Sequence, residues 1–142
     1  MDEDIIPVCN PSFRTARRIR RVEDLTRMPL LHSATRPADW AGWFANAKLA
    51  ATNAFQGSIF ENFAMISKAA VAGLGVALLP TFFVEEEIRN RSLIALAPPQ
   101  RSKSAYHLVI PETKVGTPHV EAFVKWIDEK AKRPQKTRSH SP

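Results

Sequence analysis

Residues 60–80 read FENFAMISKAAVAGLGVALLP. Asn62 is a typical helix N-cap, and small or apolar residues follow it at helical spacing. Gly73 can adopt the left-handed conformation that ends a helix, and Gly75 lets two backbones approach closely. The apolar run at 76–80 is typical of a strand covered on both faces. The stretch therefore predicts a helix followed directly by a buried strand, which is half of a β-α-β unit.

The helix tip at Asn62 and Phe63 is a candidate ligand-binding position. In open α/β sheets, ligands collect at the carboxyl ends of strands, where free helix amides also lie. A second strand is predicted at 28–33 (MPLLHS), and it ends near His32, just before the loop 33–37. His32 is therefore a second candidate, although a histidine that caps its own loop would give the same pattern.

The remaining chain alternates between short apolar runs and helical periodicity, which indicates an α/β fold. The first strand, at 5–9 (IIPVC), contains Pro7, which lacks an amide donor and so favours a sheet edge or a crossing point between subdomains. Further strands are expected at 57–61, 92–97 and 104–111. Helical segments are expected at 12–21, 22–27, 37–47, 81–91 and 117–132.

The net charge of +6 is unevenly distributed along the 142 residues. One loop carries five arginines without an acid, and a second basic run begins in the last helix and continues into the tail. These clusters are Arg14, Arg17, Arg18, Arg20 and Arg21, and Lys130, Lys132, Arg133, Lys136 and Arg138. Such clusters are solvated segments or a nucleic-acid face, whose affinity would fall steeply with salt.

Several functional classes lack their usual sequence signals. No apolar run reaches the roughly 20 residues of a membrane span. The four histidines are scattered, and no phosphate-binding, dinucleotide or nucleophile-elbow motif occurs, so we expect no metal, no cofactor and no catalytic residue. The single cysteine, Cys9, fits a reducing cytoplasm; we expect it to be buried, since a nucleophilic role would need a histidine beside it.

Four segments, in this order and spacing, resemble the effector-binding domain of LysR-type transcriptional regulators. They cover nearly all of residues 2–130 and belong to the branch that includes regulators of glycine cleavage and of β-lactamase. The segments are DEDIIPVCNPSF (2–13), MPLLH with the W-x-x-W-F helix (28–44), the stretch quoted above (60–80), and SAYHLVIPE with AFVKWIDEK (104–130).

The resemblance implies a periplasmic-binding-protein-like (type 2) α/β fold, in which a small-molecule effector lies in a cleft between two subdomains. This chain would supply one complete subdomain plus the return strand and helix of the other. The implied division is a crossing strand at 1–9, the second effector-binding subdomain at 10–98, a return segment at 99–132, and a disordered basic tail at 133–142.

The same resemblance implies which residues contact the effector. On the second-subdomain side they would follow two strands and occupy the helix tip, and one aromatic residue would come from the return segment. These residues are His32, Ser33, Thr35, Asn62, Phe63 and Tyr106. A histidine beside a helix tip would suit an anionic or amide-bearing metabolite.

The family's amino-terminal helix-turn-helix has no counterpart in this sequence. We therefore expect a carboxy-terminal fragment of a non-enzymatic cytoplasmic regulator, which would reach DNA only through that missing domain. Its other partner would be a second copy or the remainder of the regulator, because the apolar stripe of the last helix would stay partly uncovered and favour marginal stability or self-association. The alternatives are a solute-binding protein or an enzyme of similar two-lobed fold, which would need an export signal or catalytic residues.

Overall fold

The computed structural model describes residues 2–131 and divides into two units. The larger unit holds residues 3–103, and the smaller unit holds Asp2 together with the described residues from 104 onward. The subdomain limits implied by the family resemblance remain predictions.

The larger unit is built on a sheet whose strands run in the order β3-β2-β4-β1-β5, with β6 also paired to β1. Strands β2, β3 and β4 are parallel to one another, and β1 is antiparallel to β4. The strands are β1 (Asp2–Cys9), β2 (Leu30–Ser33), β3 (Gly57–Phe60), β4 (Val76–Pro80), β5 (Ile94–Ala95) and β6 (Gln100–Ala105). The α/β fold expected from the sequence is confirmed.

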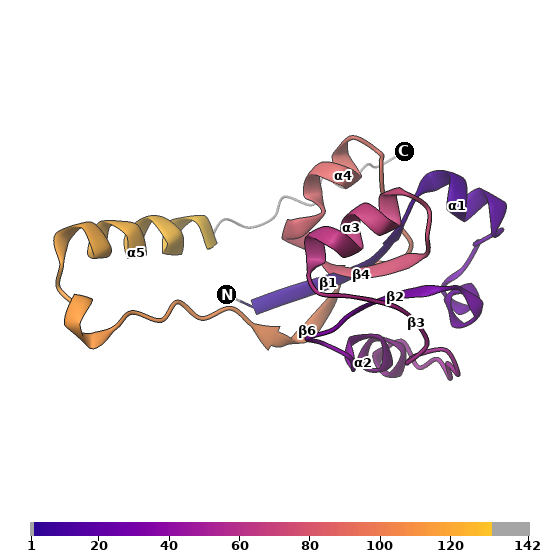
Figure 1. Cartoon of the computed structure of the whole chain (residues 1–142), viewed down its shortest axis with the longest axis horizontal. Coiled ribbons are helices and arrows are strands. Elements are labelled where there is room, and N and C mark those ends of the chain that lie inside the picture. Colours follow the sequence, from indigo (N-terminus) through magenta and orange to yellow (C-terminus); the bar gives the residue numbers. More distant parts are fainter. Residues whose placement is uncertain (1, 132–142) are drawn as a thin grey trace. The chain divides into compact units, whose positions relative to one another are not determined.

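Helices cover both faces of this sheet, with α3 and α4 on one face and α2 on the other (Figure 1). The helical segments of the larger unit are α1 (Pro11–Ala16), η1 (Val22–Arg27), α2 (Asp39–Asn46), α3 (Phe63–Val71), η2 (Thr81–Phe83) and α4 (Glu85–Arg89). The two helical turns expected between 12 and 27 are therefore present.

The core has two halves because successive side chains of each strand point to opposite faces. In β2, Leu30 packs with Trp40 and Trp43 of α2, whereas Leu31 packs with Ile66 of α3. The Trp40 Nε1 donates a hydrogen bond to the Leu31 carbonyl oxygen at 3.0 Å, which satisfies the indole inside the core. Each fully buried side chain of this size contributes about 2 kcal/mol through removal of apolar surface from water.

The helix and strand predicted from residues 60–80 are confirmed. Asn62 caps α3, because its side-chain oxygen accepts the Met65 amide at 3.0 Å. Gly73 has a φ of +77°, the left-handed conformation expected at the helix end. At Gly75, an ideal Cβ would lie 2.6 Å from the Pro29 carbonyl oxygen, so glycine is required for β4 to lie beside the start of β2.

Pro7 lies in the interior of the sheet rather than at its edge, because β1 has partners on both sides. The Pro7 carbonyl accepts the Leu96 amide at 2.9 Å on the side of β5. A strand residue directs its N–H and C=O to the same side, so the missing donor faces β5, which contains only two residues. The proline thus interrupts the ladder where the ladder is already short.

Two other expected elements differ from the structure. The helix expected at 81–91 is divided, because η2 ends at Phe83 and α4 begins at Glu85. The strand expected at 104–111 is wrong: β6 ends at Ala105, and residues 106–111 form no strand. Alternation of Tyr106, Leu108 and Ile110 gives a strand pattern, but a strand also needs a neighbouring backbone to pair with.

The smaller unit consists mainly of η3 (Glu112–Lys114) and α5 (Pro118–Ala131). Phe123 of the predicted apolar stripe is 52% exposed, and its ring stacks on Trp126 with 6.0 Å between ring centroids. The predicted tail at 133–142 lies outside the described residues. Among the described helices, none combines the length and the apolar character needed to cross a membrane.

Substitution of Gly75 by alanine tests the close approach of β4 to β2. We expect Gly75→Ala to lower the free energy of unfolding by about 2 kcal/mol, because the added methyl group meets a backbone carbonyl that cannot rotate away. Urea unfolding followed by circular dichroism measures this change. Gly42→Ala is the matched control: nothing lies within 4 Å of its Cβ position, and alanine favours the helix. Equal stability of the two variants would contradict the close approach.

Candidate functional site

The carboxyl ends of β2, β3 and β4 lie at one edge of the sheet because these strands are parallel. The amino end of β1 lies at the same edge, since β1 is antiparallel to β4 and Ile5 pairs with Pro80. Chain segments from four strands therefore converge there. This edge, which is formed by the ends of the strands and not by an outer strand, is the candidate functional site.

Two hydroxyl groups follow β2 at this edge. The Ser33 Oγ lies 3.0 Å from the Thr35 Oγ1, so the two hydroxyls share a hydrogen bond. Ser33 is buried, whereas Thr35 is exposed. The Ala34 amide donates to the Phe60 carbonyl oxygen at 2.8 Å, which ties this loop to the end of β3. Thr35 thus presents a hydroxyl to solvent from an anchored loop.

The tip of α3 lies next to these hydroxyls in the sheet order, because α3 follows β3. The Asn62 oxygen is used in capping, but its side-chain amide nitrogen has no hydrogen-bond partner among residues 2–131. The first amides of a helix also lack intrahelical partners and carry the positive end of the helix dipole. The tip therefore offers hydrogen-bond donors to an acceptor or an anion.

His32 is engaged in holding the structure. Its side chain is buried, and its Nε2 lies 2.9 Å from the Gln56 carbonyl oxygen. A carbonyl oxygen only accepts, so Nε2 carries the hydrogen and ties β2 to the segment that precedes β3. This contact matches the loop-capping interpretation of His32, and a ligand contact by His32 remains a prediction.

Arg36 is a site residue that the sequence interpretation missed. Its guanidinium donates to the Glu3 Oε1 at 2.6 Å and lies 3.9 Å from the Asp39 Oδ2. Glu3 has no exposed surface, and its other oxygen, Oε2, has no hydrogen-bond partner among the described residues. In the sequence, Arg36 is a single basic residue between the end of a strand and the start of a helix. Its acidic partner, Glu3, lies 33 positions away, so no local pattern indicates the ion pair.

The ion pair also shapes the neighbouring aromatic surface. The Arg36 guanidinium carbon lies 4.9 Å from the centroid of the Phe63 ring, and the Phe83 ring meets Phe63 edge-on at 5.9 Å. Burial raises the pKa of Asp39, the neighbouring Glu3 adds to this rise, and Arg36 opposes it. The site thus combines an oriented guanidinium, an aromatic face, hydroxyl groups and helix amides.

Five of the six predicted contact residues belong to the larger unit and lie at or beside this edge. Tyr106 belongs to the smaller unit, where it is partly exposed. Among residues 2–131, no group of three or more His, Cys, Asp or Glu side chains could hold a metal ion. The side chains at this edge can form hydrogen bonds, electrostatic interactions and aromatic contacts with a small molecule.

Cys9 lies at the opposite end of β1 and is fully buried, as expected. Burial raises the pKa of its thiol to about 11, against the opposing influence of Arg14. The thiolate is the reactive form of cysteine, so this side chain behaves as a small apolar core residue.

A sequence model described as the LysR substrate binding domain matches residues 1–132. The chain is 34% identical over 131 residues to the glycine cleavage system transcriptional activator of Escherichia coli K12. This match covers 91% of this chain and 43% of that protein. It is 33% identical over 105 residues to the HTH-type transcriptional regulator TrpI of Pseudomonas aeruginosa, covering 74% of this chain and 35% of that protein. The chain thus spans less than half the length of these relatives.

Solved structures show the same fold. The effector domain of the regulator AmpR from Pseudomonas aeruginosa matches with a TM-score of 0.72 and 24% identity, covering 92% of this chain and 62% of that chain. The AmpR effector-binding domain from Citrobacter freundii matches with a TM-score of 0.71 and 21% identity, covering 91% and 64%. The expected periplasmic-binding-protein-like fold class is therefore confirmed.

Loss of the Arg36 side chain should destabilise the larger unit through the buried carboxylate of Glu3. We expect Arg36→Met to lower the free energy of unfolding by about 3 kcal/mol, because it leaves a buried charge without its counter-ion. The double variant Glu3→Met with Arg36→Met should recover most of this loss, since it removes both charges. Urea unfolding measures both variants.

Arg101→Met provides the matched control, because Arg101 pairs with another acid of β1, Asp4, at 3.0 Å on the surface. Exposed ion pairs of this kind contribute about 0.5 kcal/mol or less. A loss as large in Arg101→Met as in Arg36→Met would contradict the special role of the buried pair.

The raised pKa of Cys9 predicts slow modification of its thiol. At pH 8 we expect a thiol reagent to modify Cys9 at least about a hundredfold more slowly in the folded chain than in urea, because burial suppresses the thiolate and blocks access. Absorbance of the released chromophore follows the reaction. A Cys9→Ala, Ser58→Cys variant, with its cysteine on exposed β3, should react rapidly in both states. Fast modification of folded Cys9 would refute the assignment.

Proposed function

Because the chain belongs to the LysR substrate-binding domain family, we propose that it is the effector-sensing part of a LysR-type transcriptional regulator. The observation that carries this proposal is the match of residues 1–132 to that domain. The relatives named above are regulators of transcription, which favours sensing over solute transport or catalysis. We assign no catalytic step and no cofactor to the chain, and we place its action in the cytoplasm.

The proposed binding surface is the sheet edge formed by the ends of β2, β3 and β4. Thr35 offers a hydroxyl group, Asn62 an amide nitrogen, and the first turn of α3 its free amides. Phe63 offers an aromatic face that Arg36 and Phe83 hold in place. These groups suit a small anionic or amide-bearing metabolite.

Ser33 and His32 support this surface from beneath, since both are buried and hydrogen-bonded at the end of β2. Tyr106 would contribute from the smaller unit. In the regulator as a whole, effector binding would be coupled to DNA through a helix-turn-helix domain, and the partner of this chain would be a second copy or the rest of the regulator.

Ligand screening of the purified 142-residue chain tests the proposal. A metabolite that binds the folded chain raises its melting temperature, and a ligand at a hundredfold its Kd adds about 2.7 kcal/mol of stability. Isothermal titration calorimetry then gives the Kd. We expect Thr35→Val to weaken binding up to about tenfold, because it removes one hydrogen-bonding hydroxyl and keeps the side-chain shape.

Thr26→Val is the matched control, because the Thr26 hydroxyl donates to the Glu23 carbonyl oxygen within η1, which precedes the amino end of β2, whereas the proposed surface lies at the carboxyl end of β2. It should leave the Kd unchanged. A ligand whose affinity is the same in wild type, Thr35→Val and Asn62→Ala would bind elsewhere and would contradict this assignment of the site.

A further inference from the structure

A pocket of about 530 Å³ lies at the edge of the sheet opposite to the proposed effector surface. It is lined by residues of α1, α4 and β5, and all of these belong to the larger unit. Strand β5 pairs with the carboxyl end of β1, where Cys9 faces Ile94. Because β1 is antiparallel to β4, this end of β1 lies where β2 and β4 begin.

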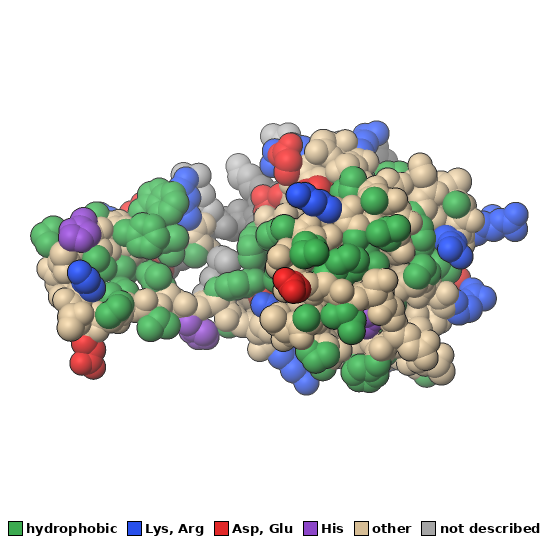
Figure 2. Space-filling view, in the orientation of Figure 1, with side chains coloured by type: hydrophobic (Ala, Val, Ile, Leu, Met, Phe, Trp, Pro, Cys, Tyr) green, Lys and Arg blue, Asp and Glu red, His purple; other side chains and the backbone are tan. Residues whose placement is uncertain are grey.

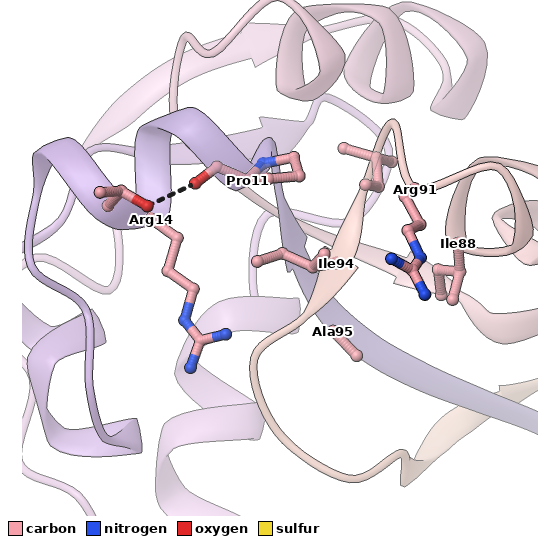
Figure 3. A pocket seen from close by; sticks show the side chains of 8 residues that line it. Pro11, Arg14, Ile88, Arg91, Ile94 and Ala95 are labelled. Carbon is pink, nitrogen blue, oxygen red and sulfur yellow. Dashed lines mark hydrogen bonds between the residues drawn. The ribbon is translucent and has the colours of Figure 1, made fainter. Parts of the chain in front are cut away.

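The floor and one wall of this pocket are apolar. Ile88 comes from α4, and Ile94 and Ala95 come from β5 (Figure 3). Ala95 is exposed, and Ile88 and Ile94 are half-buried, so apolar surface remains open to solvent here. The Thr15 hydroxyl also lines the pocket, but it donates to the Pro11 carbonyl oxygen at 3.2 Å. The lining therefore favours an apolar group.

Two arginines flank this apolar surface. Arg14 extends from α1 on one side of Ile94, and Arg91 lies on the other side, after α4 (Figure 3). The Arg14 Nε donates to the Ile19 carbonyl oxygen at 3.2 Å, which fixes the direction of its side chain. Neither guanidinium forms an ion pair with a carboxylate of residues 2–131. The pocket thus carries two positive charges that the described part of the chain leaves uncompensated.

Arg91 occupies a position at which most side chains are unfavourable. Its φ is +63°, in the left-handed region that glycine and asparagine prefer at the end of a helix. Arg18 and Lys48 share this conformation, so the conformation alone does not mark the pocket. Arg91 is the one of these three residues that lines the pocket, where it places a cation.

The surroundings would attract an anion. Arg17, Arg18, Arg20 and Arg21 follow Arg14, and Figure 2 shows Lys and Arg side chains gathered at the α1 end of this unit. An excess of positive charge near an opening raises the local concentration of anions and speeds their association. The arginine cluster of the sequence therefore lies beside the pocket and not at the effector surface.

We propose that this pocket is a second ligand site, which binds a small monocarboxylate with an apolar body. The carboxylate would accept hydrogen bonds from Arg91, Arg14 would add positive charge from the other side of the pocket, and the apolar body would cover Ile94 and Ala95. A volume of about 530 Å³ falls within the range of small-molecule pockets. A fully hydrated phosphate would leave the apolar floor uncovered, which favours the carboxylate over an inorganic anion.

Calorimetric titration of the 142-residue chain with 4-phenylbutyrate tests this site, with 4-phenylbutanamide as the uncharged counterpart. We expect 4-phenylbutyrate to bind saturably and about tenfold more tightly than the amide, as a charge-assisted hydrogen bond requires. The variant Arg91→Gly should weaken 4-phenylbutyrate binding by about tenfold. It should not lower the melting temperature, because glycine relieves the left-handed backbone at this position.

Two control variants separate this site from general charge and from the effector surface. Arg17→Gln removes an equal charge from the same segment without removing a pocket residue, and it should change the Kd less than twofold. Thr35→Val alters only the effector surface and should leave 4-phenylbutyrate binding unchanged. A loss in Thr35→Val equal to that in Arg91→Gly would overturn the proposal, as would equal affinity for the acid and the amide.

Binding of a DNA duplex is the alternative role for these arginines. Its binding would fall steeply with salt and would be weakened by Arg17→Gln as much as by Arg91→Gly. That outcome, together with an absence of saturable 4-phenylbutyrate binding, would assign the arginines to nucleic acid and overturn the proposal. Displacement of 4-phenylbutyrate by other apolar monocarboxylates, but not by inorganic phosphate, is the expected result.

Discussion

The antiparallel pairing of β1 with β4 is the interaction on which the rest of the structure depends. It joins a parallel β-α-β region to the first strand of the chain and gives the sheet two chemically different edges. The edge at the carboxyl ends of the parallel strands receives helix tips and hydroxyl groups. The opposite edge receives the carboxyl end of β1, the arginine-rich segment and a pocket. Without this pairing, Glu3 could not reach the loop that carries Arg36.

The buried contact between Glu3 and Arg36 gives the proposed effector surface its rigidity. A guanidinium held by the Glu3 carboxylate, with Asp39 nearby, and stacked on Phe63 has few alternative orientations, so the aromatic face stays fixed before any ligand arrives. Buried ion pairs seldom add net stability, because desolvation of both charges offsets their attraction. The benefit here is orientation: the ligand need not order these side chains when it binds.

The sequence predicted features that depend on local backbone chemistry and missed those that depend on distant contacts. Asn62 and Gly73 predicted a helix cap and a helix end, because each of them acts within a few residues of its own position. Gly75 indicated a close approach of two backbones, but the sequence did not identify the partner, which is the carbonyl of the distant Pro29. The ion pair between Glu3 and Arg36 joins positions far apart, and no local pattern marks it. The alternation from Tyr106 to Ile110 predicted a strand, but pairing needs a neighbouring strand that periodicity cannot supply. The pocket could not be predicted for the same reason: its walls come from residues 11–15 and 88–95, which are distant in the sequence.

Glycine at two positions restricts how this chain can vary. Ideal Cβ atoms at Gly57 and Gly75 would lie 1.9 Å and 2.6 Å from the carbonyl oxygens of Leu30 and Pro29, on the two sides of the start of β2. Both contacts involve backbone, so compensating substitutions of neighbouring side chains cannot relieve them. Any side chain larger than hydrogen at Gly57 or Gly75 would therefore force the backbones of β3 or β4 away from β2, so variation at these two positions is limited by main-chain geometry.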